Sequence, residues 1–215
     1  MPTDEEWSFH LNLRKNRPAY EHEQANYSLL RHLLAFSGKR VLDVGCGQGY
    51  LLSKLRKDNV IAGVDYIPDN PYRIPKKVVD LDRDRLPFRP RSFDVIICSN
   101  VLEHITRPLH VLQQVKTCLA PGGMAIIALP NEYTLRNKVD FVLGKPLVSH
   151  QIDAFGHKYI AGIGQWTALV AQVFPRFRRE LRPQRERGIV GMASRLLSPM
   201  FPSLNTEQII FIAER

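Results

Sequence analysis

The chain has 215 residues, with 44% hydrophobic and 24% charged residues, which suffices for one buried core and excludes a disordered or collagen-like chain. Lysine and arginine total 30 against 21 aspartate and glutamate, a net charge of +9 that favours anionic partners or surfaces. The apolar runs fall short of the roughly 18 residues that a membrane-spanning helix needs. We therefore expect one globular domain without a transmembrane segment.

Two features bear on the cellular compartment. Residues 1–7 carry acidic side chains and no apolar core, unlike a secretory signal or an arginine-rich transit peptide. Three cysteines, Cys46, Cys98 and Cys118, are odd in number and lack the spacing of metal ligands. We expect a cytoplasmic protein, and we leave open a peripheral contact with an anionic membrane.

Alternating helices and strands are predicted along the first part of the chain. Helices are expected at residues 20–36, 50–57 and 109–119, the last ended by Pro121-Gly122-Gly123. Short apolar runs predict strands at residues 41–44, 60–65, 77–81, 93–99 and 124–129. This alternation predicts a parallel sheet with helices on both faces.

The alternation loosens after Pro130. Helices are expected at 135–143 and 164–174, and strands at 177–181 and 208–213, whereas 182–204 reads as irregular because of its prolines and glycines. We interpret residues 131–157 and 182–204 as insertions that shape a substrate site, since loops on a rigid scaffold commonly carry specificity.

A glycine-rich turn follows the strand predicted at 41–44. Gly45, Gly47 and Gly49 would let the backbone turn sharply and approach a ligand closely, but the dinucleotide fingerprint G-x-G-x-x-G spaces its third glycine more widely. A carboxylate at Asp43 would repel a pyrophosphate and attract an α-ammonium group. Asp65 closes the next strand, about 20 residues later, where an acid can accept hydrogen bonds from ribose hydroxyls. The pattern points away from NAD.

Five segments occur in a fixed order: VLDVGCGQGY, GVDYIP, DLDRDRLPF, FDVIICSNVLEHI and LAPGGMAIIALPN. This set resembles the class I S-adenosylmethionine-dependent methyltransferases, in particular the small type 11 and MetW-like group, closely over residues 39–131 and loosely elsewhere. The resemblance implies a Rossmann-like, doubly wound α/β fold whose mostly parallel seven-stranded sheet has an antiparallel last strand. It also implies one domain, 1–215, with a helical lead-in (1–38), a cofactor-binding core (39–131) and a substrate-shaping half (132–215).

The resemblance assigns a cofactor, S-adenosylmethionine, and the residues that bind it. Asp43 and the backbone of 45–49 would hold the methionine part, Asp65 the ribose, and Tyr66 one face of the adenine, although a tyrosine there could simply cover the sheet edge. Asp80 and Leu81 would meet the adenine edge, with Asp82 as an alternative. The complete expected set is Asp43, Gly45, Cys46, Gly47, Gly49, Tyr50, Asp65, Tyr66, Asp80, Leu81, Ser99 and Asn100.

Cys46 and the segment around Glu103 each invite a second interpretation. No basic residue adjoins Cys46 to activate its thiol, so we expect packing rather than nucleophilic catalysis.

Ubiquinone-type O-methyltransferases carry a Glu-x-x-Glu-His pattern that can bind a divalent metal, but here Asn100 replaces the first glutamate. Losing one carboxylate weakens the site for a hard cation, so we predict no metal.

Two histidines are candidate catalytic residues. His157 lies in a polar cluster with Asp153 and Tyr159, before the helix predicted at 164–174, where relatives often carry a histidine that faces the substrate. His104 is the second candidate general base, its alternative being a hydrogen-bonding residue beneath the active-site loop.

An arginine-rich run and an apolar stretch follow each other near the C-terminus. The arginines are Arg176, Arg178, Arg179, Arg182, Arg185 and Arg187, offset by Glu180 and Glu186. A charge run is most often a solvated face. With the apolar residues 188–201 beside it, the run also suits an anionic lipid or a phosphate.

These patterns predict a methyltransferase that acts on a small-molecule or lipid-linked acceptor, anionic and partly apolar, by in-line transfer. Nucleic-acid (RNA) methylation is the alternative within enzymes. Against amino-methylating DNA enzymes, the predicted strand at 93–99 leads into Ser99-Asn100-Val101-Leu102 rather than an Asn/Asp-Pro-Pro-aromatic motif. A non-catalytic cofactor-binding protein of the same fold is the second alternative.

Overall fold

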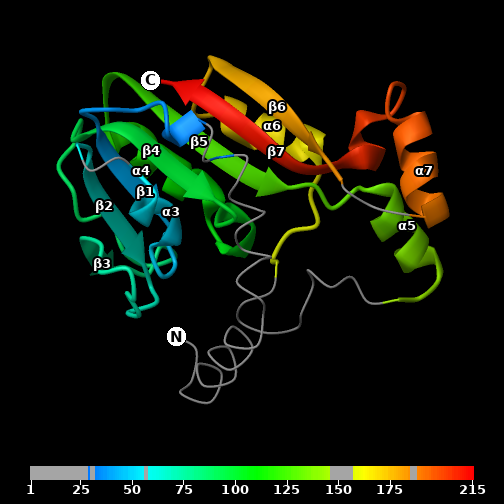
Figure 1. Ribbon diagram of the computed structural model, residues 1–215, viewed down its shortest axis with the longest axis horizontal. Coiled ribbons are helices and arrows are strands. Elements are labelled where there is room, and N and C mark those ends of the chain that lie inside the picture. The colour runs from blue at the N-terminus through cyan, green and yellow to red at the C-terminus, as the bar shows by residue number, and fades with distance from the viewer. Residues whose placement is uncertain (1–28, 30–31, 56–57, 146–156, 185–187) are drawn as a thin grey trace.

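A computed structural model describes residues 29, 32–55, 58–145, 157–184 and 188–215. Seven strands form one sheet in the order β3-β2-β1-β4-β5-β7-β6 (Figure 1). The strands are β1 (Arg40–Val44), β2 (Val60–Asp65), β3 (Lys76–Val78), β4 (Phe93–Ser99), β5 (Leu119–Pro130), β6 (Phe177–Pro183) and β7 (Thr206–Glu214).

The strand directions confirm the predicted fold class. β1 runs parallel to β2 and β4, and parallel pairing continues outward to β3 and β5. β7 runs antiparallel to both of its neighbours, β5 and β6. The strand order reverses between β1 and β4, and ligands of open α/β sheets bind beyond the carboxyl ends of the strands at such a point.

Helices cover both faces of the sheet. They are α3 (Tyr50–Ser53), η1 (Leu102–His104), α4 (Pro108–Cys118), α5 (Leu135–Val142), α6 (Ile163–Ala171), α7 (Gly188–Leu197) and η2 (Pro202–Asn205). Leu42 of β1 packs in a core with Val111 of α4 and Trp166 of α6. Its neighbour Val41 packs in the opposite core with Leu52 of α3. This alternation of side chains along a strand is what a sheet buried on two faces requires.

The predicted N-terminal helix, residues 20–36, lies largely outside the described residues. Leu29 and Leu33 are helical in the structure and have no exposed surface. Both belong to the core on the α3 side of the sheet.

The prediction that residues 182–204 are irregular is wrong in part. β6 extends to Pro183, and residues 188–197 form α7, followed by the short η2. The buried residues of α7 are Gly191 and Ser194 rather than large apolar ones. Ile189, Met192 and Leu196 do have helical spacing, but the prolines and glycines of residues 182–204 favour the irregular interpretation.

Several boundaries also differ from the predicted ones. α3 ends at Ser53 rather than at residue 57, and β3 covers only Lys76–Val78. β5 begins at Leu119, before the Pro121-Gly122-Gly123 segment, because Leu119 pairs with Phe93 and pairing resumes at Met124 after a register shift. Gly122, at φ +70°, accommodates the irregularity.

Candidate active site

The glycine-rich turn connects β1 to α3 through three left-handed residues. Gly45, Gly47 and Gly49 have φ values of +77°, +54° and +93°. A Cβ atom on Gly45 would collide with Val101, and one on Gly49 would lie 2.6 Å from Ile74. A Cβ on Gly47 would meet no atom within 4 Å. Gly45 and Gly49 therefore allow close packing, whereas Gly47 borders open space.

Gly47 is held from both sides. Its N–H donates to Oδ2 of Asp65 at 2.7 Å, and its carbonyl accepts from Nζ of Lys76 at 2.6 Å. The second oxygen of Asp65 accepts from the N–H of Ile67 at 2.9 Å. The Asp65 carboxylate thus ties the glycine-rich turn to the end of β2. Lys76 was not predicted, because a lone lysine in a short strand carries no pattern.

Burial changes the acid–base chemistry of this site. Burial, with a further contribution from Asp65, raises the pKa of Asp43 to about 8. A cationic ammonium group beside Asp43 would favour its charged form. Burial also raises the pKa of the Cys46 thiol to about 12, which is the opposite of an activated nucleophile.

Asp80 and Asp82 both lie in the loop after β3, but their side chains make different contacts. Asp82 accepts hydrogen bonds from the N–H of Thr106 at 2.7 Å and from Nζ of Lys158 at 3.0 Å. Burial opposes its ionisation, but these bonds prevail and lower the pKa of Asp82. Asp82 therefore joins three segments of the chain, which leaves Asp80 as the better candidate for the adenine edge. Leu81 between them is buried.

The end of β4 presents two polar side chains. Within the described part of the chain, Oγ of Ser99 is buried without a hydrogen-bond partner. Asn100 has φ +53°, a left-handed conformation that asparagine tolerates, and its Oδ1 accepts from Gln208 at 3.2 Å. The open space at Gly47, the buried acids and the Ser99 hydroxyl fit a ligand with ammonium and hydroxyl groups, as S-adenosylmethionine has.

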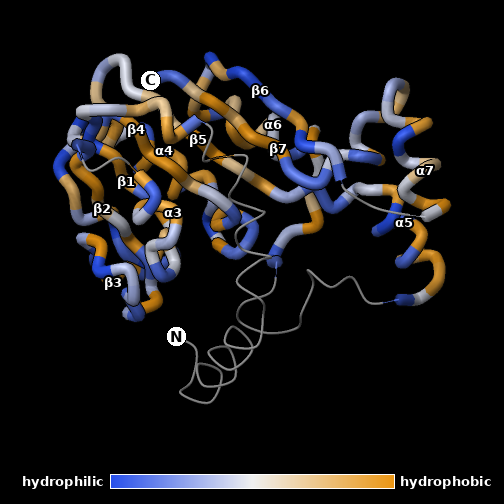
Figure 2. The backbone as a smooth tube through the Cα atoms, viewed as in Figure 1, coloured by the Kyte–Doolittle hydropathy of each residue, from blue (hydrophilic) through white to orange (hydrophobic). Residues whose placement is uncertain are grey.

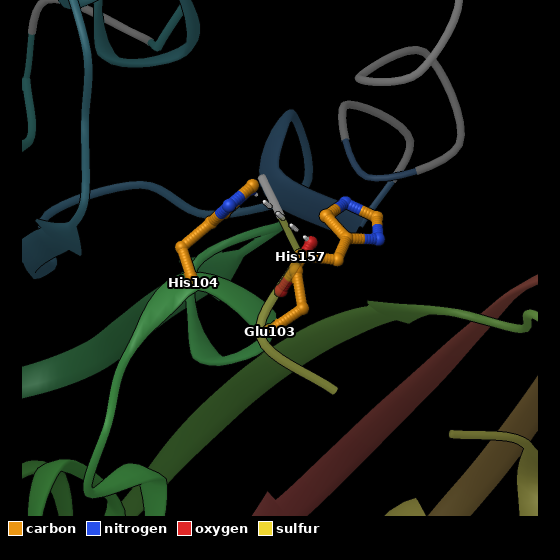
Figure 3. Close-up of side chains that lie close together, drawn as sticks. All are labelled: Glu103, His104 and His157. Carbon is orange, nitrogen blue, oxygen red and sulfur yellow. Dashed lines mark ion pairs between the residues drawn. The ribbon is translucent and has the colours of Figure 1, made fainter. Parts of the chain in front are cut away.

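Two imidazole rings and a buried carboxyl group lie together beyond the end of β4. The ring centroids of His104 and His157 are 4.9 Å apart, and Nε2 of His104 lies 4.0 Å from Oε1 of Glu103. Figure 3 shows the three side chains converging. Burial raises the pKa of Glu103 to about 7. One ligand atom from each residue lies within 4.8 Å of the others, so the group could approach a metal ion.

A second carboxylate positions His157. Nδ1 of His157 lies 2.7 Å from Oε1 of Glu132, and this glutamate is 6% exposed. Oε2 of Glu132 accepts from the side-chain amide of Asn137 at 3.0 Å. Asp153, which the sequence grouped with His157, lies outside the described residues. Glu132 was missed, because only the fold brings the end of β5 beside residue 157.

The sequence pattern of one family, described as a methyltransferase domain, matches residues 19–180, more than half of the chain. The chain belongs to the class I S-adenosylmethionine-dependent methyltransferases. S-adenosylmethionine is the cofactor of this family, in agreement with the prediction.

Relatives and solved structures agree with this assignment. A protein of Haemophilus ducreyi named ubiquinone biosynthesis O-methyltransferase is 29% identical over 57% of this chain and 58% of its own. One of the same name from Albidiferax ferrireducens is 27% identical over 66% of this chain and 61% of its own. This methyltransferase therefore spans about three fifths of the length of these relatives. A crystal structure of a SAM-dependent methyltransferase from Archaeoglobus fulgidus superimposes with a TM-score of 0.67 at 17% identity, covering 96% and 99% of the two chains.

Proposed function

We propose that this methyltransferase transfers the methyl group of S-adenosylmethionine to an oxygen atom of a small-molecule or lipid-linked acceptor that is anionic and partly apolar. The observation that carries the proposal is the Glu132–His157 pair beside His104, at the edge of the sheet where β4 and β5 end. An oxygen nucleophile must lose its proton, and a positioned imidazole can accept it. The O-methyltransferase names of the relatives agree with this choice of atom.

In the proposed reaction the cofactor supplies an activated methyl group. A proton on Nδ1, held by Glu132, would place the basic lone pair of His157 on Nε2. Nε2 would take the acceptor's proton as the carbon–oxygen bond forms and the carbon–sulfur bond breaks. S-adenosylhomocysteine and the methyl ether would then be the products. Alignment of the reacting atoms supplies much of the rate in such a displacement.

The cofactor would be held by the residues predicted from the sequence, with Lys76 as an addition. Asp43 would face the α-ammonium group and Asp65 the ribose, while Tyr66, Asp80 and Leu81 would surround the adenine. Lys76 would act by fixing the carbonyl of Gly47. We also propose that methyl transfer needs no metal, since Asn100 contributes no carboxylate to the group around His104.

The segment η2 lies near the end of β5, close to the histidines in the chain's fold. η2 packs against α5, and the amide of Asn131, at the end of β5, donates to the carbonyl of Ser203 at 2.7 Å. Residues 202–205 thus lie beside Asn131, the neighbour of Glu132, and this contact supports a substrate-shaping role for the segment. Of the arginine-rich run, Arg185 and Arg187 lie outside the described residues.

The proposed function is tested in two steps. Calorimetry should detect binding of S-adenosylmethionine and S-adenosylhomocysteine. Mass spectrometry should then detect a gain of one methyl group on phenols that carry a carboxylate or an alkyl chain, and none on RNA. Methyl transfer to RNA alone would favour the alternative enzyme class, and cofactor binding without any transfer would favour a non-catalytic protein.

A further inference from the structure

Helix α7 carries its large apolar side chains outward. Its buried residues are Gly191 and Ser194, and Oγ of Ser194 lies 3.2 Å from Oδ1 of Asn205 in η2. The side chains on the opposite face are 82%, 54% and 74% exposed at Ile189, Met192 and Leu196. A helix that serves only its own domain has the reverse arrangement, with large apolar residues facing inward. This inverted helix therefore indicates a binding surface.

The exposed apolar surface continues on both sides of these residues. α5 has no buried residue and packs against α7 and η2. Figure 2 shows hydrophobic stretches of both helices at the same end of the molecule. We call this surface the α5–α7 face: Phe141, Val142, Leu143, Ile189, Met192, Leu196, Leu197, Met200 and Phe201, all exposed. A gathering of large exposed apolar residues on neighbouring helices is typical of interaction sites.

The charges around the α5–α7 face are mainly positive. Residues 188–205 contain Arg195 and no acidic residue. Residues 135–145 contain one acid, Asp140, which pairs with Arg136 at 2.6 Å and with Lys145 at 3.8 Å. Arg136, Lys138, Lys145 and Arg195 thus give these two segments four basic residues. The single carboxylate, that of Asp140, is already paired. Such a surface complements an anionic one.

This charge distribution argues against a second copy of the chain as the occupant. A symmetric dimer brings the same patch of both copies together, so the surplus cations of the two faces would repel each other. An anionic bilayer complements both components of the face. Its acyl chains can bury the apolar side chains, and its negatively charged headgroups attract the basic ones.

We propose that the α5–α7 face docks on the surface of an anionic phospholipid bilayer. Among the described residues no helix is long and apolar enough to cross a membrane, so docking would be peripheral. Helix α5 leads directly from this face to the candidate site, since Asn137 in its first turns donates to Glu132. If the proposed function holds, a lipid-linked acceptor would reach His157 along this path.

The test is co-sedimentation of the full chain with vesicles of phosphatidylcholine alone and with about one quarter phosphatidylglycerol. The apolar variant combines Ile189→Ser, Met192→Ser and Leu196→Ser. The charge variant combines Lys138→Gln and Arg195→Gln. A matched control replaces two exposed valines elsewhere, Val60→Ser and Val78→Ser, which are 67% and 63% exposed. Affinity for S-adenosylhomocysteine, measured on every variant, reports whether the fold and cofactor site are intact.

Wild type and control should bind the anionic vesicles equally. The apolar variant should bind them at least tenfold more weakly, since it removes three large apolar side chains that the bilayer would withdraw from water. The charge variant should lose affinity and salt dependence together. All variants should keep their affinity for S-adenosylhomocysteine.

The docking proposal is overturned if the wild-type protein does not co-sediment with anionic vesicles. It is equally overturned if the apolar variant binds these vesicles with the same affinity as wild type. It is also overturned if sedimentation shows a dimer that the apolar variant abolishes, because a second copy would then occupy the face. Vesicle binding requires no turnover. Failure of cofactor binding would therefore count against the proposed function, while the vesicle result alone would decide the docking.

Discussion

Nδ1 of His157 lies 2.7 Å from the carboxylate of Glu132, although 25 residues separate them in the chain. The carboxylate fixes the ring orientation, as carboxylates do for catalytic histidines in general. A second pair of this kind joins His32 to Glu180 on the edge strand β6, with Nε2 of His32 3.2 Å from the carboxylate. The two pairs offer a matched comparison.

Replacing His157 with alanine should lower kcat by about 10² to 10⁴, the usual contribution of a general base. Glu132→Gln should lower kcat less, by about tenfold or more, with little change in KM, because it misorients the ring without removing it. Added imidazole should restore part of the activity of His157→Ala only. Rates are measured on the acceptor found by mass spectrometry. Glu180→Gln, the control, should leave kcat unchanged. If it lowered kcat as much as Glu132→Gln does, the Glu132–His157 pair would have no special role in catalysis.

Replacing Asp65 with alanine should weaken S-adenosylmethionine binding at least tenfold, since hydrogen bonds to a charged acceptor contribute roughly 1.5 to 3 kcal/mol each. Asp65 also holds Gly47, so Lys76→Met is the informative companion, because it loosens Gly47 while sparing the ribose partner. We expect Lys76→Met to cost less affinity than Asp65→Ala in calorimetry. Asp94→Ala, which removes the partner of Arg40 at the start of β1, should leave this affinity unchanged. Equal losses for the first two variants would mean that Asp65 acts only on the loop.

Asp43→Asn should remove part of the pH dependence of stability. The unfolded aspartate has a pKa of about 4, whereas burial raises the folded pKa to about 8. Between these values only the folded chain holds the proton, so stability falls as pH rises and levels off above pH 8. Between pH 5 and pH 8 the wild type should therefore lose on the order of 3 to 4 kcal/mol of unfolding free energy that the variant keeps, as measured by urea unfolding at both pH values. The variant should also bind S-adenosylmethionine more weakly. An unchanged pH dependence would contradict the shifted pKa.

Methyl transfer should survive exhaustive treatment with EDTA, because Asn100 supplies no carboxylate to the group of Glu103, His104 and His157. Asn100→Glu is the complementary variant, which we expect to bind Mg²⁺ more tightly than wild type in calorimetry. Abolition of wild-type activity by EDTA and its restoration by Mg²⁺ would show that the natural site uses a metal.

The sequence by itself determined the fold class and the family. Short apolar runs alternate with helical spacing, and the glycine-rich turn and Asp65 occupy fixed places in that order, so local patterns sufficed. The tertiary structure decided what depends on distant segments: Lys76 on Gly47, Glu132 on His157, and the outward apolar face of α7. The spacing of Ile189, Met192 and Leu196 is helical, but the prolines and glycines of residues 182–204 favour an irregular interpretation. Only the tertiary structure shows that Gly191 and Ser194 are the inward residues of α7, because a periodic pattern does not say which face of a helix meets the core.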